Sequence, residues 1–316
     1  MAARKKADEL TIVRVYEAPV AAVWDAWTDP QQVAQWWGPR GFTLTTHSKD
    51  LRAGGHWAYT MHGPDGTDYP NKTIYHEVSL HRRLVYDHGG HDERPPLFRV
   101  TVDFIDLGGQ TRMEMTMRCP TPEEAEATRR FIQKAGGHAT WDRLAEYLEA
   151  AADGRDVFVI NRSFDADIET LFSMWVDPRH FARWMGPAGS TLSFLEAKVE
   201  PGGSSRYVMT SATGQVMYVQ LRYLQIEPAH RLVYAQNFCD REGRLAKPPF
   251  APTWPDVMLI TVTFAAEGPA QTRVTVRSEI DGTATEIERR TFREAKPGMT
   301  AGWTEAFDKL DASLLA

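Results

Sequence analysis

Alternation of apolar and polar residues runs through much of the first half of the chain and predicts β-strands. In residues 56–62, 83–88, 98–105 and 111–118, every second side chain is apolar or carries a ring. One face of each strand would therefore be buried and the other exposed to water. Residues 11–18 are rich in β-branched side chains and predict another strand before these. Together the segments predict an antiparallel sheet with a single buried face.

Helical patterns flank these strands. Pro19 opens one short helical stretch, and Asp29-Pro30 supplies an N-cap and a first-turn proline for a second. Residues 121–151 carry apolar side chains at three- and four-residue steps, with acids in the first turn. This pattern predicts one long amphipathic helix. Gly136-Gly137 lies inside it, and we expect a kink or broken turn there because glycine destabilises helices.

The whole pattern occurs twice. Residues 15–39, VYEAPVAAVWDAWTDPQQVAQWWGP, return 148 positions later as residues 163–187, SFDADIETLFSMWVDPRHFARWMGP. The same offset relates Gly54-Gly55 to Gly202-Gly203, which we expect to form turns or bulges, and it continues for about 70 residues. Such a register indicates a duplicated domain.

The duplication predicts the organisation of the chain. We expect one domain over residues 8–152 and a second over residues 156–316, joined too closely to move far apart. The second copy has an insertion within residues 238–256 and a repeated long helix over residues 283–315. Pro297-Gly298 lies inside this helix, where we again expect a kink or broken turn.

Composition narrows the classes of function. The formal net charge is −6 and the basic residues are scattered among acids, which disfavours nucleic-acid binding. Cys119 and Cys239 lie in no metal or redox motif and fit idle thiols in a reducing compartment. No stretch is apolar enough for a membrane helix or a signal peptide. We therefore expect a cytoplasmic protein with no membrane segment, metal or cofactor.

Several motifs together resemble a known family. They are the segment of residues 15–39, the Gly-Gly pair, the Arg-Leu-Val-Tyr segments at 83–86 and 231–234, and the tryptophans of the long helices, Trp141 and Trp303. They are similar to the SRPBCC (START-like, helix-grip) superfamily, in the branch of the activator of heat-shock protein 90 ATPase. The resemblance implies an α+β fold, in which an antiparallel sheet wraps around a long C-terminal helix and two short helices follow the first strand. It specifies fold far better than activity, because the superfamily includes carriers, polyketide cyclases and co-chaperones.

The two copies depart from the family pattern in different places. The family commonly places glycine before the helix tryptophan, which the second copy keeps as Gly302-Trp303 and the first replaces with Thr140-Trp141. The first copy has Trp36-Trp37 where the second has Trp184-Met185. Two cavities of this fold would therefore differ chemically.

The resemblance implies a hollow between the sheet and the long helix, with inward side chains that suit a small hydrophobic or aromatic molecule. The alternative is that the same side chains fill a solid core. The candidate ligand-binding residues are Trp37, Trp57, Tyr59, Met61, Tyr86, His88, Phe104, Met113 and Trp141 in the first copy, and Trp184, Tyr207, Met209, Tyr234, Gln236, Phe264 and Trp303 in the second.

His88 is the main candidate catalytic residue, and Tyr86 is a second group that would move a proton in a cyclase-like reaction. His88 lies two residues after Tyr86 and should therefore face the same side, toward the interior. It precedes His91, Asp92 and Glu93, and the sequence predicts that this segment forms a loop. The second copy has Gln236 at this position, which weakens both a catalytic and a metal-binding interpretation.

Three functions stay open. They are ligand binding, a cyclase or dehydratase reaction, and contact with a protein partner of a chaperone or stress system. In the last, exposed tryptophans near Trp36-Trp37 would serve as anchors. The duplication also predicts a monomer whose two domains pack as a pseudo-symmetric pair.

Overall fold

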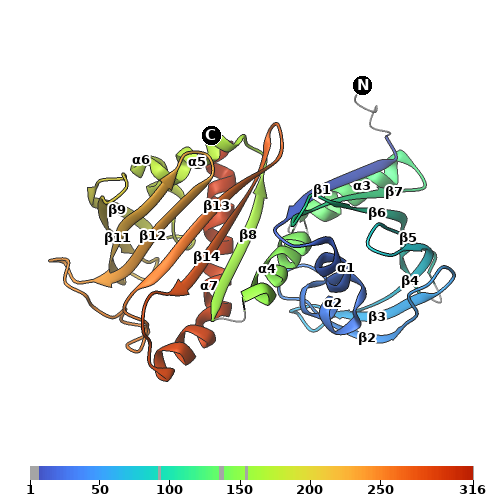
Figure 1. Cartoon of the computed structure of the whole chain (residues 1–316), viewed down its shortest axis with the longest axis horizontal. Helices are drawn as coiled ribbons and strands as arrows, with labels where there is room; N and C mark the ends of the chain where they lie inside the picture. The colour runs from blue at the N-terminus through green and yellow to red at the C-terminus, as the bar shows by residue number, and fades with distance from the viewer. Residues whose placement is uncertain (1–6, 92–93, 135–138, 154–155, 316) are drawn as a thin grey trace. The chain divides into compact units, whose positions relative to one another are not determined.

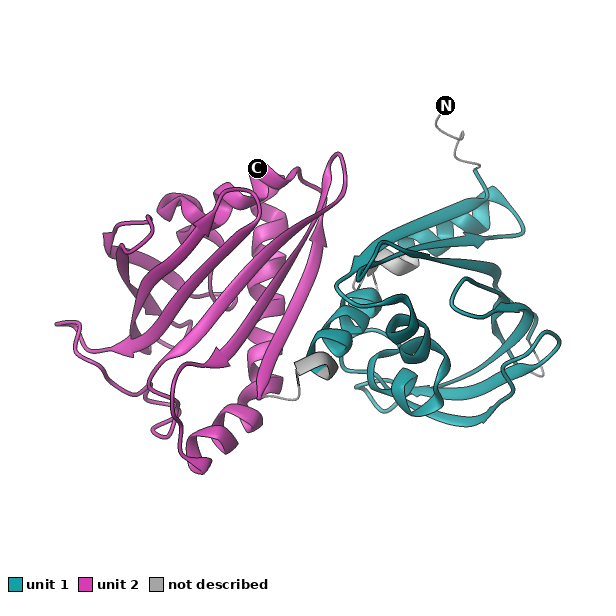
Figure 2. Cartoon of the chain, in the orientation of Figure 1, with its two compact units in different colours: residues 1–152 teal, residues 153–316 magenta. Residues whose placement is uncertain are grey.

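The computed structural model describes residues 7–91, 94–134, 139–153 and 156–315. The chain divides into two compact units, residues 1–152 and residues 153–316 (Figure 2). Each unit has its own seven-stranded antiparallel sheet and its own buried core. The expected two helix-grip domains are thus confirmed, and each is described by itself below.

The first unit follows the predicted order of elements (Figure 1). Its sheet has the strand order β1-β7-β6-β5-β4-β3-β2, so that strands β2 to β7 pair in sequence order and β1 pairs with β7. The elements are β1 Glu9–Tyr16, α1 Val20–Thr28, α2 Pro30–Trp36, β2 Thr43–Lys49, β3 His56–His62, β4 Asp68–Ser79, β5 Arg83–Gly90, β6 Phe98–Asp106, β7 Thr111–Arg118, α3 Pro122–Lys134 and α4 Ala139–Asp153.

The second unit repeats this topology with the strand order β8-β14-β13-β12-β11-β10-β9. A single helix, α7, lies across one face of its sheet (Figure 1). The elements are β8 Val157–Phe164, α5 Ile168–Val176, α6 Pro178–Trp184, β9 Thr191–Ala197, β10 Ser204–Thr210, β11 Val216–Glu227, β12 Arg231–Cys239, β13 Met258–Gly268, β14 Gln271–Ile280 and α7 Glu286–Leu314.

Matching caps start the second short helix of each pair. The Asp29 carboxylate accepts hydrogen bonds from the backbone N–H groups of Gln31 and Gln32 at 2.8 and 2.9 Å. Asp177 accepts one from the N–H of Arg179 at 2.8 Å. The proline that follows each aspartate has no N–H to leave unpaired in the first turn. Both Asp-Pro pairs are therefore helix caps, as the sequence predicts.

The glycine pairs form tight turns between strands. Gly54 and Gly202 both have φ of +78°, in the left-handed region that favours glycine. A side chain on Gly55 would lie 2.1 Å from the Asp50 carbonyl oxygen, and one on Gly203 would lie 2.3 Å from that of Lys198. Each pair is therefore required by the turn that it forms.

The breaks expected in the long helices have different outcomes. In the first unit α3 and α4 are described on either side of residues 135–138, and Gly136-Gly137 lies outside the described residues. In the second unit α7 continues through Pro297, so the helix has no broken turn there, but its ribbon bends along its course as the alternative of a kink predicts (Figure 1). Buried side chains on both sides of the proline, Phe292 and Phe307 among them, hold the two halves of α7 on the sheet.

The inner face of each sheet carries the side chains that the alternation assigns to it. In the first unit Trp57, Tyr59, Val102, Phe104 and Met113 are buried in one core cluster. Across the described residues, no helix is both long and apolar enough to cross a membrane.

Candidate ligand cavity

A cavity of about 800 Å³ lies in the first unit, between the inner face of the sheet and helices α3 and α4. The described residues that line it come from strands β1, β3, β4, β5, β6 and β7, from both helices, and from the connections at 37–39 and 94–97. This volume lies within the range of small-molecule sites. The expected hollow between sheet and C-terminal helix is therefore present in this unit.

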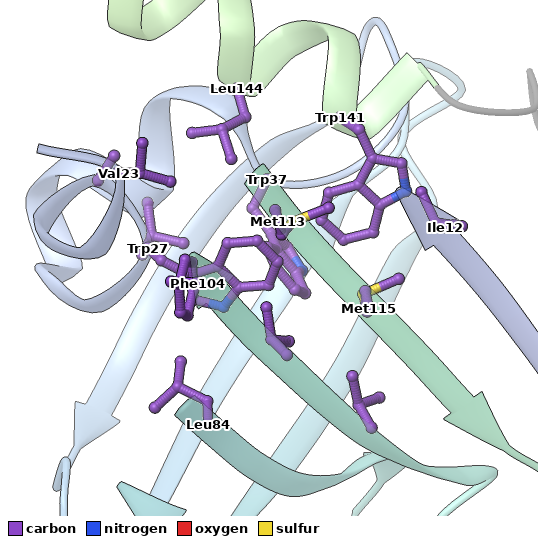
Figure 3. Close-up of a cluster of buried hydrophobic side chains, with 14 of the residues drawn as sticks. Ile12, Val23, Trp27, Trp37, Leu84, Phe104, Met113, Met115, Trp141 and Leu144 are labelled. Atoms are coloured by element: carbon purple, nitrogen blue, oxygen red, sulfur yellow. The ribbon is translucent and has the colours of Figure 1, made fainter. Parts of the chain in front are cut away.

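Aromatic and thioether side chains form most of the cavity wall. Trp141 extends from α4 toward Met115 and Ile12 on the sheet, with Trp37 beside it (Figure 3). The Trp141 ring stacks on Trp27 with centroids 5.4 Å apart and planes 14° apart, which fixes its orientation. Such walls suit a flat apolar molecule, because ring faces and polarisable sulfur both pack well against aromatic groups.

The structure divides the predicted residues of the first copy into two sets. Those that line the cavity are Trp37, Met61, Tyr86, His88 and Trp141. Those that lie in the core without lining it are Trp57, Tyr59, Phe104 and Met113. Both alternatives from the sequence, a hollow and a filled core, thus describe different parts of one inner face.

Other lining residues were not among the sequence candidates. Phe98 and Met117 continue the alternation of strands β6 and β7, and that signal could have identified them. Arg94 and Leu97 lie in the Arg-Pro-Pro-Leu segment before β6, which has no periodicity to place it against the cavity. Thr128 lies on α3, where the helix packs over the sheet.

His88 lies in strand β5, which continues to Gly90, so the expected loop position is wrong. Its ring stacks on Phe98 with centroids 5.2 Å apart. Neither ring nitrogen has a hydrogen-bond partner among the described residues, and Nδ1 has no access to water. Burial, helped by the positive charge of Arg94, lowers the pKa of His88 to about 4. The imidazole is therefore neutral at physiological pH.

The cluster that follows His88 in sequence does not form a described metal site. His91 exchanges backbone hydrogen bonds with Arg94 at 3.0 Å, while Asp92 and Glu93 lie outside the described residues. Within the described part of the chain, no group of three His, Cys, Asp or Glu side chains is arranged to hold a metal ion.

The Trp36-Trp37 pair does not form an exposed anchor. Trp36 is 0% exposed and Trp37 is 6% exposed. The Trp36 indole N–H donates to the Ala26 carbonyl at 2.9 Å, and that of Trp184 donates to the Met174 carbonyl at 2.8 Å. Trp184 therefore corresponds to Trp36 in the core, and the expectation of exposed tryptophans as a protein-binding surface is wrong.

One arginine holds the segment that carries Trp37. Arg143 on α4 donates to the carbonyl oxygens of Gly38 and Pro39, both at 2.9 Å, and of Gln35 at 3.1 Å. We expect Arg143→Met to destabilise the first unit by about 2–3 kcal/mol, because it leaves these carbonyls without a charged donor. Hydrogen exchange at residues 35–42 should rise well above that of wild type. Unchanged exchange there would show that Arg143 does not hold the segment.

The second unit buries most of its counterpart residues. Tyr207, Met209, Tyr234 and Phe264 lie in its core, while Gln236 and Trp303 are half-buried. Trp303 stacks on Trp175 with centroids 6.0 Å apart, as Trp141 stacks on Trp27.

Two buried aromatic side chains of the second unit match, by position in the sequence, residues that line the cavity in the first unit. Counted from the helix caps Thr121 and Thr285, Thr128 corresponds to Phe292; counted from the matched strands β6 and β13, Arg94 corresponds to Trp254. Trp254 and Phe292 are both buried, with ring centroids 5.9 Å apart.

The inserted segment that carries Trp254 is tied to α7. Lys247 pairs with Glu288 at 3.1 Å, and the hydroxyls of Thr253 and Thr291 lie 2.7 Å apart. The segment therefore packs against the helix through polar contacts as well as through Trp254.

Comparison with protein families identifies the fold family directly. The family model described as activator of Hsp90 ATPase homolog 1-like protein matches residues 17–149 and again residues 165–314. The chain belongs to this family. Both copies of the duplicated domain are thus members of it, as the resemblance implied, while a search of curated proteins finds no match.

Solved structures with similar folds come from several sources. A protein from Nitrosomonas europaea is 24% identical, with 47% of this chain and 99% of that chain covered and a TM-score of 0.43. Protein Ms6760 from Mycobacterium smegmatis is 20% identical, with 52% and 92% covered and a TM-score of 0.43. The di-domain ARO/CYC BexL from the BE-7585A biosynthetic pathway is 13% identical, with 98% and 99% covered and a TM-score of 0.40.

Membership of this family does not by itself fix an activity, because function depends on the site and not on the fold. The chemistry of the cavity in the first unit therefore has to be argued from its own residues. The most informative of these is His88, whose state can be tested independently of any ligand.

Lowering the pH should destabilise the first unit partly through His88. Its pKa is about 4 in the folded protein, against an ordinary value of 6.5, so the unfolded chain takes up this proton first as the pH falls. The stability contributed by the neutral ring is complete above pH 6.5 and is lost toward pH 4. Between pH 7 and pH 4.5, the free energy of unfolding should fall by about 1–2 kcal/mol less in His88→Gln than in wild type. Identical pH profiles of unfolding for the two proteins would contradict the buried, neutral state.

Proposed function

We propose that the first unit binds a small, largely apolar aromatic molecule in the cavity between its sheet and helices α3 and α4. The observation that carries the proposal is the cavity of about 800 Å³, whose wall contains Trp37, Trp141, Met115 and Met117. In the second unit, the buried and mutually packed Trp254 and Phe292 stand at the corresponding positions of the sequence. We infer that the first unit performs the binding and that the second unit is a filled copy.

The energetics favour a flat apolar ligand. Burial of apolar surface contributes about 25 cal/mol per Å², so a ligand of two or three fused rings gains several kcal/mol on entering such a cavity. The side chains that hold the wall in place are themselves stacked or hydrogen-bonded, as Trp141 is on Trp27. Little side-chain ordering is then needed on binding, which preserves this gain.

Native mass spectrometry of the freshly purified protein, compared with its denatured mass, tests the proposal. A cavity of this kind retains a tight ligand through purification, so a discrete extra mass is expected. A panel of aromatic molecules supplies the second measurement, since a ligand at a hundredfold its Kd adds about 2.7 kcal/mol to stability. A clean apo mass together with no thermal shift across the panel would overturn the proposal.

A second candidate function is a cyclase- or dehydratase-like reaction, in which His88 or Tyr86 moves a proton. The observation that favours it is an imidazole without a protein partner in the cavity wall. A general base works best with a pKa near the working pH, and a pKa of about 4 makes His88 a weak base at neutral pH. Binding is therefore the better supported function.

His88→Gln, which copies Gln236 of the second unit, distinguishes the two functions. Binding should survive this change, whereas turnover of any substrate that is found should fall by 100-fold or more if His88 transfers a proton.

We place the function in the cytoplasm, because the free thiols of Cys119 and Cys239 fit a reducing compartment. A single chain that works without a second copy is the simplest assembly for a duplicated domain.

A further inference from the structure

Two neighbouring polar side chains of the cavity wall have no hydrogen-bond partner in the part of the chain that the structure describes. Tyr86 and His88 lie on the inner face of β5, with ring centroids 6.4 Å apart. The Tyr86 hydroxyl forms no hydrogen bond with a described residue, and neither does the His88 ring. Of these atoms only His88 Nδ1 is fully buried, so the hydroxyl and Nε2 remain accessible. Their surroundings are otherwise apolar, with Phe98 stacked on His88 and Trp37 at 6.1 Å from it.

An unpaired polar group in such a place lowers stability. A buried donor or acceptor without a partner costs about 1–3 kcal/mol, and side chains that face a cavity recover this energy from whatever fills it. The same burial raises the pKa of Tyr86 well above its ordinary value and lowers that of His88, so both groups are neutral at physiological pH. The occupant of the cavity thus meets a neutral hydroxyl and a neutral imidazole at one point of an aromatic wall.

These two groups define the chemistry of the ligand at that point. A phenol hydroxyl both donates and accepts, and a neutral imidazole has one donor and one acceptor nitrogen. A hydroxyl on the ligand can therefore bond to the Tyr86 hydroxyl, to His88 Nε2 or to both, whereas His88 Nδ1 has no accessible surface. A carboxylate would bring a full charge beside two neutral groups, which is far more costly in an apolar site unless a cation pairs with it. The nearest cation of the wall, Arg94, is exposed, and its Nε already donates to the Gly89 carbonyl at 3.0 Å.

We propose that the ligand is a planar aromatic molecule that bears a hydroxyl group, with the hydroxyl placed against Tyr86 and His88. This inference rests on the proposed function, since it concerns the same cavity. Tyr86 and His88 are then the residues that determine specificity, while the tryptophan and methionine wall supplies affinity. The second unit carries Tyr234 and Gln236 at these two positions, and these residues provide matched controls.

Binding of 2-naphthol and of naphthalene, measured by equilibrium dialysis of the full-length protein, tests the proposal. Wild type should bind 2-naphthol about tenfold more tightly, the ratio that corresponds to one net hydrogen bond of about 1.4 kcal/mol. Tyr86→Phe and His88→Leu should each reduce this ratio toward one. The ratio within each variant is the readout, because any change of the cavity wall affects both molecules while only 2-naphthol has a hydroxyl to lose a partner. Tyr234→Phe in the second unit should leave the ratio unchanged.

The failures of the two proposals are distinguishable. If wild type binds both molecules equally, the inference about the hydroxyl group is overturned while the proposed binding function stands. A preference that persists in both Tyr86→Phe and His88→Leu also overturns it, because the hydroxyl is then recognised elsewhere. If neither molecule binds to wild type, the proposed function fails and the inference fails with it.

Discussion

A double variant, Arg94→Trp with Thr128→Phe, should weaken ligand binding by the first unit by about 100-fold or more. The change transplants the aromatic pair of the second unit, Trp254 and Phe292, onto the corresponding positions at the border of the cavity. An indole and a phenyl ring that pack together there would occupy space that the ligand needs. A 100-fold loss corresponds to about 2.7 kcal/mol, which is reached once the ligand loses the burial of a single ring.

Isothermal titration with any ligand identified by mass spectrometry, or with 2-naphthol, measures this effect. Leu80→Trp is the control, because Leu80 is 67% exposed and does not line the cavity. It adds a tryptophan without filling the interior and should bind as wild type does. Unaltered affinity in the double variant would mean that ligands bind elsewhere. The thermal stability of the double variant should stay near that of wild type or increase, which separates occupation of the cavity from unfolding.

Trp254→Gly should produce the opposite change in the second unit and lower its stability by about 3–5 kcal/mol. Removal of a large buried aromatic side chain loses its transfer free energy and leaves a cavity that the surroundings refill only in part. The backbone of Trp254 forms two hydrogen bonds that do not depend on its side chain. Its N–H donates to the Ala251 carbonyl, and its carbonyl oxygen accepts from the Lys247 ammonium group. The loss should therefore come mainly from the missing indole.

Added indole should restore part of this stability, since an apolar cavity of the shape of a lost side chain binds a matching molecule. Thermal unfolding of Trp254→Gly with and without millimolar indole measures the rescue. The same measurement on wild type shows how much indole stabilises the protein when Trp254 is present. Leu245→Ala is a control within the same insertion, because Leu245 is 54% exposed, and it should change stability by less than about 0.5 kcal/mol. A small loss in Trp254→Gly, or a loss that indole leaves unchanged, would show that Trp254 does not fill an interior site.

The two predictions together assign different roles to the two copies. The first unit combines a cavity with two polar groups, Tyr86 and His88, that have no hydrogen-bond partner among the described residues. We propose that Trp254 and Phe292, which pack on each other, fill the corresponding space in the second unit. A duplication of this kind allows one copy to keep a binding site while the other becomes a structural unit. The experiments above test each half of this assignment separately.

Some of the candidate site was accessible from sequence. The alternation along β3, β5 and β7 correctly assigned Met61, Tyr86, His88 and their neighbours to the inner face of the sheet. The same alternation could not separate Tyr86, which lines the cavity, from Tyr59, which lies in the core. Parity along a strand specifies the face on which a side chain lies, but not the distance from that face to the helix opposite.

The positions that contradict the sequence predictions share a cause. α7 continues through Pro297 instead of breaking there, because buried residues on both sides of the proline, Phe292 and Phe307 among them, pack in the core. The burial of Trp36 and Trp37 likewise depends on contacts with residues farther along the chain, Trp57 and Trp141. Local signals carry no information about such contacts.

The sequence by itself determined the duplicated helix-grip fold, because repeats, helix caps and strand periodicity are all properties of short segments. Asp29 and Asp177 cap their helices through bonds that span only two or three residues, and the glycine pairs turn the chain in place. Only the tertiary structure showed that the inner face of the first unit is hollow. That outcome depends on how far each helix lies from its sheet and on whether a residue such as Trp254 reaches the space between them, and both are set by contacts between segments far apart in the chain.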